Sequence, residues 1–104
     1  MQDIRYNWEW KDYDDFRIKY GSDSGNMEAF SSWVRIFQYY DGLGILISRG
    51  LLDKTLVADM MSETMILFWE RCEAVINGAR EYYNLPQACE WTEFLYNIIK
   101  ENVD

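Results

Sequence analysis

The strongest constraint on the fold is a helical repeat of apolar side chains over residues 63–83. Met65, Trp69, Cys72 and Ala79 lie four, three and seven residues apart, which brings them onto one side of an α-helix. Charged residues occupy the other sides of the same stretch. An amphipathic helix buries its apolar side against other elements, so the rest of the chain is expected to supply packing partners.

The same period predicts helices along the whole chain. Residues 27–49 carry a broad apolar stripe through Trp33, widened towards a second side by Tyr39 and Leu46. The sequence predicts an all-α fold, a compact four- to five-helix bundle with helices about 8–20, 27–49, 54–61, 63–83 and 87–102. Residues 1–104 are expected to form a single helical domain, because this length suits one domain.

Polar and glycine-rich positions mark the predicted junctions. Asp53 is the predicted N-cap of the short helix 54–61, in which Leu56, Val57 and Met60 are expected to face inward. Ser62 is the predicted cap of the next helix. These capping residues are the reason for predicting two helices between residues 54 and 83.

Two glycines lie inside the predicted helix 27–49. In a helix interior, Gly42 and Gly44 each cost about 1 kcal/mol relative to alanine, so a reason for them is expected. Close approach of a crossing helix is the structural explanation, and a ligand against bare backbone is the functional one. The pair Asp41-Gly42 is also a candidate helix break.

The charge balance limits the partners that the chain can bind. It has 10 basic and 18 acidic residues, a net charge of −8. Such a surface repels nucleic-acid phosphates and anionic lipid, so neither direct nucleic-acid binding nor membrane binding is expected. No stretch approaches the ~20 apolar residues of a membrane span. The first residues also lack a signal-peptide pattern, so a cytoplasmic location is expected.

The sequence lacks the common catalytic motifs, mainly because the residues that they require are missing. The chain has no histidine and two cysteines, Cys72 and Cys89. This excludes Ser-His-Asp catalysis and histidine-based zinc sites, and no glycine-rich phosphate loop is present. We therefore predict no catalytic residue, no cofactor and no metal site. Two cysteines are too few for a disulfide scaffold, and whether they meet stays open.

Carboxylates and one arginine are the remaining candidates for chemistry. Glu70 and Glu73 share a helix side, as do Glu90 and Glu93, and exposed surface pairs are the favoured interpretation. Arg80 lies among aromatic residues. We favour a helix-to-helix brace in which Arg80 pairs with an acid such as Glu90, over an anion site. A carboxylate-metal or small-anion enzyme using Glu70, Glu73 and Arg80 is an alternative.

The aromatic content points to protein contacts. Aromatic residues make up 17% of the chain, and their amphipathic rings suit interfaces. The predicted function is a non-catalytic protein-interaction or assembly module that binds a protein partner or itself. Trp8, Trp10 and Tyr13 are the predicted interaction surface. The other alternative is an acidic nucleic-acid mimic that inhibits a basic protein, which requires one contiguous negative face.

Several short motifs resemble a known family. They are Leu43-Gly44, Gly50-Leu51-Leu52-Asp53, Trp69 and Arg80, within about residues 30–99. The chain resembles a family of small prokaryotic all-helical proteins known only as a domain of unknown function. The resemblance implies an all-helical fold and no assigned activity.

Overall fold

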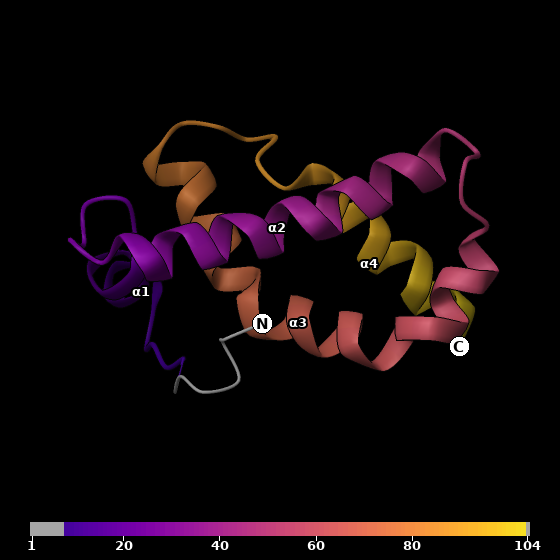
Figure 1. Cartoon of the computed structure of the whole chain (residues 1–104), viewed down its shortest axis with the longest axis horizontal. Helices are drawn as coiled ribbons and strands as arrows, with labels where there is room; N and C mark the ends of the chain where they lie inside the picture. Colours follow the sequence, from indigo (N-terminus) through magenta and orange to yellow (C-terminus); the bar gives the residue numbers. More distant parts are fainter. Residues whose placement is uncertain (1–7, 104) are drawn as a thin grey trace.

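Four α-helices make up most of the chain in the computed structural model, which describes residues 8–103 (Figure 1). They are α1 (Tyr13–Tyr20), α2 (Met27–Ser48), α3 (Lys54–Tyr82) and α4 (Glu90–Val103). Residues 8–103 contain no strand, and the predicted all-helical fold is confirmed. None of the helices in this range is long and apolar enough to cross a membrane.

α4 is the element that the two long helices share. It packs against both α2 and α3, and Figure 1 shows it passing behind α2. Its Leu95 and Ile99 side chains are completely buried, as is Met65 of α3. Burial of each such side chain contributes about 1.5–3 kcal/mol relative to its exposure, so these residues form the centre of the core.

Aromatic rings connect the three long helices. The ring of Phe68 in α3 stacks on Tyr40 of α2 with their centroids 4.3 Å apart, and it lies 5.7 Å from the ring of Phe37. The next residue of α3, Trp69, stacks on Tyr96 of α4 with their ring centroids 5.4 Å apart. Adjacent residues of α3 therefore face two different helices.

The first helix is shorter than the predicted 8–20. α1 begins at Tyr13 because the side chain of Asp12 caps it, accepting a hydrogen bond of 2.9 Å from the backbone N–H of Asp15. A capping residue satisfies an amide that has no partner inside the helix. Residues 8–12 consequently lie outside the helix.

α3 spans the two helices predicted at 54–61 and 63–83, and a kink at the predicted junction divides it into two helical segments. Within α3 the only residue with non-helical angles is Met61, at φ −146° and ψ 21°. Because this kink lies between the two predicted ranges, the helical segments on its two sides correspond to the two predicted helices. The predicted cap at Asp53 is confirmed, since its side chain accepts a hydrogen bond from the backbone N–H of Thr55 at 3.2 Å.

The last helix begins later than the predicted 87–102, whereas α2 matches its predicted range closely. α4 starts at Glu90 because Cys89 has a φ of +59°, in the left-handed region that interrupts a right-handed helix. α2 starts at Met27, where the side chain of Asn26 accepts a hydrogen bond from the N–H of Ala29 at 3.1 Å. α2 runs unbroken to Ser48, so the candidate break at Asp41-Gly42 is wrong.

Gly44 lies where α2 and α4 cross. A Cβ atom at this position would be 2.1 Å from the carbonyl oxygen of Trp91. Only glycine permits this approach of the two backbones, which confirms the packing explanation for Gly44. A Cβ at Gly42 would meet nothing within 4 Å, so the explanation does not extend to Gly42.

We expect Gly44→Ala to lower the free energy of unfolding by about 1–3 kcal/mol, because the added methyl group pushes α4 away from α2. Gly42→Ala is the matched control in the same helix. It adds the same group in open space and should be neutral or stabilising by up to about 1 kcal/mol. Urea unfolding followed by circular dichroism measures both. Equal effects of the two substitutions would contradict the packing role of Gly44.

Candidate functional site

The start of α4 is held by a carboxylate from another helix. Oδ1 of Asp41 in α2 accepts hydrogen bonds from the backbone N–H and the hydroxyl of Thr92, both at 2.7 Å. Thr92 is completely buried. The first amides of a helix lack partners inside the helix and carry its positive dipole end, so a carboxylate is stabilising there. Asp41 thus acts as a helix cap supplied across the α2–α4 contact.

Arg80 ties α3 to the start of α4. Its Nε donates to the backbone carbonyl of Ala88 at 2.8 Å, and its Nη1 donates to the side chain of Asn77 at 3.3 Å. Its Nη2 forms an ion pair with Glu93 at 2.9 Å. These three contacts reach α3, the connecting loop and α4, which is the geometry of a brace.

The acid that pairs with Arg80 is Glu93, whereas the sequence analysis named Glu90. Residues three apart on a helix differ by about 60° around its axis. Glu93 is partly buried at the α3–α4 contact, while Glu90 is exposed.

Both cysteines are free thiols with little reactivity. Burial raises the pKa of Cys72 to about 12. Burial, with a contribution from the charge of Asp41, raises the pKa of Cys89 to about 11. The thiolate is the nucleophilic form, and such thiols are almost wholly protonated at neutral pH. Neither Cys72 nor Cys89 is therefore suited to act as a thiolate nucleophile.

The carboxylates considered for metal binding do not converge. Glu70 and Glu73 are exposed on α3, whereas Arg80 is turned into the contact with α4. Within residues 8–103 there is no group of three or more His, Cys, Asp and Glu side chains that could hold a metal ion.

The predicted interaction surface of Trp8, Trp10 and Tyr13 lies against the rest of the chain. The rings of Trp8 and Trp10 are 5.4 and 5.5 Å from the buried ring of Trp33, both edge-on. In an α-helix, side chains two residues apart diverge by about 200°, so both can reach Trp33 only because this segment is not helical. The ring of Tyr13 fills the space above Gly78, where a Cβ would be 2.4 Å from it.

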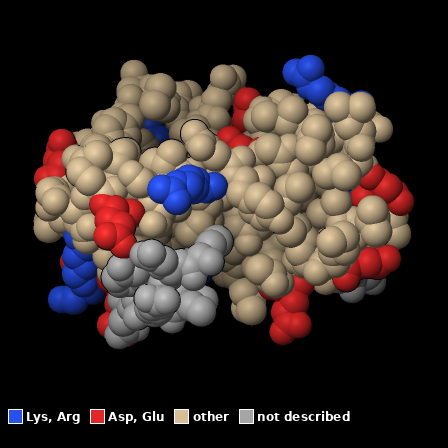
Figure 2. Space-filling model, viewed as in Figure 1, with Lys and Arg blue, Asp and Glu red and all other residues tan. Residues whose placement is uncertain are grey.

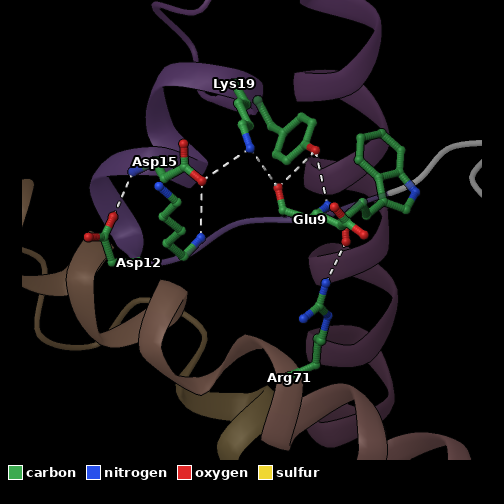
Figure 3. A network of polar contacts seen from close by, with 8 residues as sticks. Glu9, Asp12, Asp15, Lys19 and Arg71 are labelled. Atoms are coloured by element: carbon green, nitrogen blue, oxygen red, sulfur yellow. Dashed lines mark hydrogen bonds and ion pairs between the residues drawn. The ribbon is translucent and has the colours of Figure 1, made fainter.

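Polar contacts hold this N-terminal segment in place (Figure 3). The guanidinium of Arg71 lies 4.3 Å from the ring centroid of Trp10 and donates a hydrogen bond to the carbonyl of Trp8. The hydroxyl of Tyr20 and the ammonium of Lys19 each lie 3.2 Å from the carbonyl oxygen of Glu9. The sequence analysis missed this cation–π contact of Arg71, because no local pattern indicates a contact between residues 61 positions apart.

The outward side of α3 carries large apolar residues. Leu56, Met60 and Leu67 are 51%, 75% and 59% exposed. The prediction that Leu56 and Met60 face inward is therefore wrong, and of that short segment Val57 and Ala58 are buried. We define the outer face of α3 as these three residues with two exposed acids, namely Leu56 and Met60 before the kink and Glu63, Leu67 and Glu70 after it.

The outward side of α2 has a similar row. Tyr39 is 56% exposed and Leu46 is 38% exposed, although both were predicted to widen the packed side of this helix. We define the outer face of α2 as Arg35, Tyr39, Gly42, Leu46 and Arg49. By contrast, the outward residues of α4 are polar, as Glu90, Asn97 and Lys100 show.

A double-mutant cycle tests the Arg80 brace. Combining Arg80→Ala with Glu93→Ala should show a coupling of about 0.5–1 kcal/mol in the free energy of unfolding, since the two groups are in contact. The matched cycle with Glu90→Ala should show coupling near zero. A larger coupling to Glu90 than to Glu93 would refute this assignment.

The comparison with protein families gives a match over almost the whole chain. The family described as a domain of unknown function, DUF4760, matches residues 2–98, a range that includes the motifs between residues 30 and 99. We find no significant similarity to a curated protein or to a solved structure. The chain belongs to the DUF4760 family of domains of unknown function, as its sequence motifs predicted.

Proposed function

We propose that this chain is a non-catalytic protein-interaction module that binds through the outer faces of α2 and α3. One observation carries the proposal: Leu56 and Met60, before the kink of α3 at Met61, and Leu67, after it, are each more than half exposed. Removing such side chains from water on binding contributes about 25 cal/mol per Å² of apolar surface. Rows of exposed apolar side chains rimmed by polar ones are typical of interaction sites.

α4 provides an internal comparison. Its buried side holds Leu95 and Ile99, while its outward side is polar at Glu90 and Asn97. That is the ordinary pattern of a helix with one side in water. α2 and α3 depart from it, since both have large apolar residues on the side that does not face the core. A protein partner that covers this side accounts for the departure.

The alternative of an acidic nucleic-acid mimic lacks a supporting observation. It requires one contiguous negative face. Exposed acids occur on every helix, for example Asp14, Glu28, Glu63 and Glu90. On the face seen in Figure 2, the acidic side chains are scattered, most of them near the edge, and a basic side chain stands in the mainly uncharged middle. The metal or small-anion alternative likewise lacks support, because Arg80 is paired with Glu93.

The proposal includes a cytoplasmic location and a compact helical bundle as the working unit. Both cysteines are free, which is the state that a reducing compartment maintains. The four helices each contribute to one apolar cluster, through Phe16, Trp33, Trp69 and Leu95 respectively. A rigid core of this kind would hold the outer faces of α2 and α3 in a fixed relation.

A photo-crosslinking residue tests the interaction surface. With benzoylphenylalanine in place of Met60, irradiation of cells expressing the chain should produce a covalent protein adduct whose mass identifies the partner. Asn97, exposed on the polar side of α4, is the matched control position and should give no adduct. The proposal fails if position 60 gives no adduct, or if position 97 gives the same adduct in equal yield.

A further inference from the structure

The outer face of α2 is basic, although the protein is acidic. Arg35 and Arg49 are both exposed, and within residues 8–103 neither side chain forms a hydrogen bond or an ion pair. Other arginines are engaged inside the chain, as Arg80 and Arg71 are. The guanidinium groups of Arg35 and Arg49 are therefore available to a partner.

No exposed acid offsets this charge along α2. Of the 18 acidic residues in the chain, only Asp41 lies within residues 29–52, whereas two of the 10 basic residues lie there, Arg35 and Arg49. The carboxylate of Asp41 is turned inward, where it accepts both hydrogen bonds from Thr92. Positive charge is therefore concentrated on the outer face of α2, in a chain whose net charge is −8.

The two arginines lie on one side of α2, at opposite ends of an apolar stretch. Because Arg35 and Arg49 are separated by almost four helical turns, they lie about 20 Å apart along the helix. α2 is unbroken over this length, and Arg49 is its C-cap. Between them come Tyr39, Gly42 and Leu46, and at about 100° per residue all five positions fall within about 80° around the helix axis. Tyr39 and Leu46 are exposed, and a Cβ atom at Gly42 would meet nothing within 4 Å.

Figure 2 shows this face from outside. The view is that of Figure 1, in which α2 crosses the middle of the molecule in front of α4. A basic side chain stands over α2 in the mainly uncharged middle, and the acidic side chains are scattered, most of them near the edge. Because few carboxylates surround this cation, its field acts on an anion that approaches the face.

We infer that the outer face of α2 binds an acidic segment of another protein, in which apolar side chains lie between carboxylate groups about 20 Å apart. This inference rests on the proposed interaction function and adds the chemistry of the partner. Guanidinium groups bind carboxylates through two parallel hydrogen bonds, and tyrosine and arginine are among the side chains that contribute most at interfaces. Tyr39 and Leu46 contact the apolar part of the segment, and the open space at Gly42 receives one of its side chains.

The charge of the rest of the chain selects among anionic partners. Nucleic acids and anionic lipid surfaces extend well beyond the ~20 Å of this face, so they would also meet the acids elsewhere on a chain of net charge −8. A short protein segment contacts the face of α2 alone. A second copy of the chain would bring a further net charge of −8 to the contact, and its exposed acids lie on all four helices without marking one complementary surface.

Photo-crosslinking from the middle of this face, combined with charge reversal, tests the inference. Benzoylphenylalanine in place of Tyr39 keeps an aromatic ring at an exposed position. Irradiation of cells expressing the chain should give an adduct with another protein. Within about seven residues on either side of the crosslink, a length that spans 20 Å even in a helix, the partner should have more Asp and Glu than Lys and Arg. Arg35→Glu with Arg49→Glu should lower the adduct yield at least about tenfold.

A second pair of charge reversals is the matched control. Lys11→Glu with Lys100→Glu changes the net charge by the same amount at exposed positions outside α2, so the adduct yield should stay nearly unchanged. Circular dichroism shows whether each variant is folded. If the arginine reversal does not fold, Arg35→Gln with Arg49→Gln takes its place, and it should lower the yield in the same direction.

The possible results separate this inference from the proposed function. The inference is overturned if position 39 gives no adduct, if the adduct is a second copy of the chain, or if the partner sequence at the crosslink is neutral or basic. It is also overturned if loss of the two arginine charges leaves the yield unchanged. An adduct from position 60 in any of these cases leaves the interaction function standing through the outer face of α3. If neither position gives an adduct, both proposals fail.

Discussion

The structure depends on the crossing of α2 and α4. Gly44 allows the carbonyl of Trp91 to lie close to the α2 backbone. One turn earlier, the carboxylate of Asp41 accepts hydrogen bonds from the backbone N–H and the hydroxyl of Thr92. The two features need each other. Without the glycine, α4 could not reach the carboxylate, and without the carboxylate a buried helix terminus would lack an acceptor for its amide, at a cost of about 1–3 kcal/mol.

This crossing determines which sides of the helices remain outside. α4 packs against the inner side of α2. Its buried Leu95 and Ile99 form the centre of the core with Met65 of α3. Arg80 fixes the loop between α3 and α4 and so keeps the start of α4 in place. The rows on α2 and α3 that hold Tyr39 and Met60 then face away from the core. The proposed interaction surface consists of apolar side chains that the core leaves exposed to solvent.

Local sequence predicted much of this fold, because helix periodicity and N-caps depend on residues that are close together in the chain. Gly44 itself indicated a close approach of another helix, although not which residue approaches it. It predicted Arg80 as a brace residue but named Glu90 as its partner, since local sequence does not show which side of the last helix lies beside Arg80. The capping role of Asp41 was missed, and a helix break was considered there as an alternative, because its partner Thr92 lies 51 residues away. The exposure of Leu56 and Met60 was missed for a related reason. The spacing of apolar residues shows which of them share a side of a helix, but it does not show which sides the neighbouring helices cover.

Hydrogen exchange of the Thr92 backbone amide tests the central claim most directly. If the carboxylate of Asp41 holds the start of α4 as part of the core, this amide should exchange as slowly as those of Leu95 and Ile99, through global unfolding. Fast exchange at Thr92 beside slow exchange at Leu95 and Ile99 would contradict the account. It would mean that the first turn of α4 opens freely while the rest of the helix stays packed.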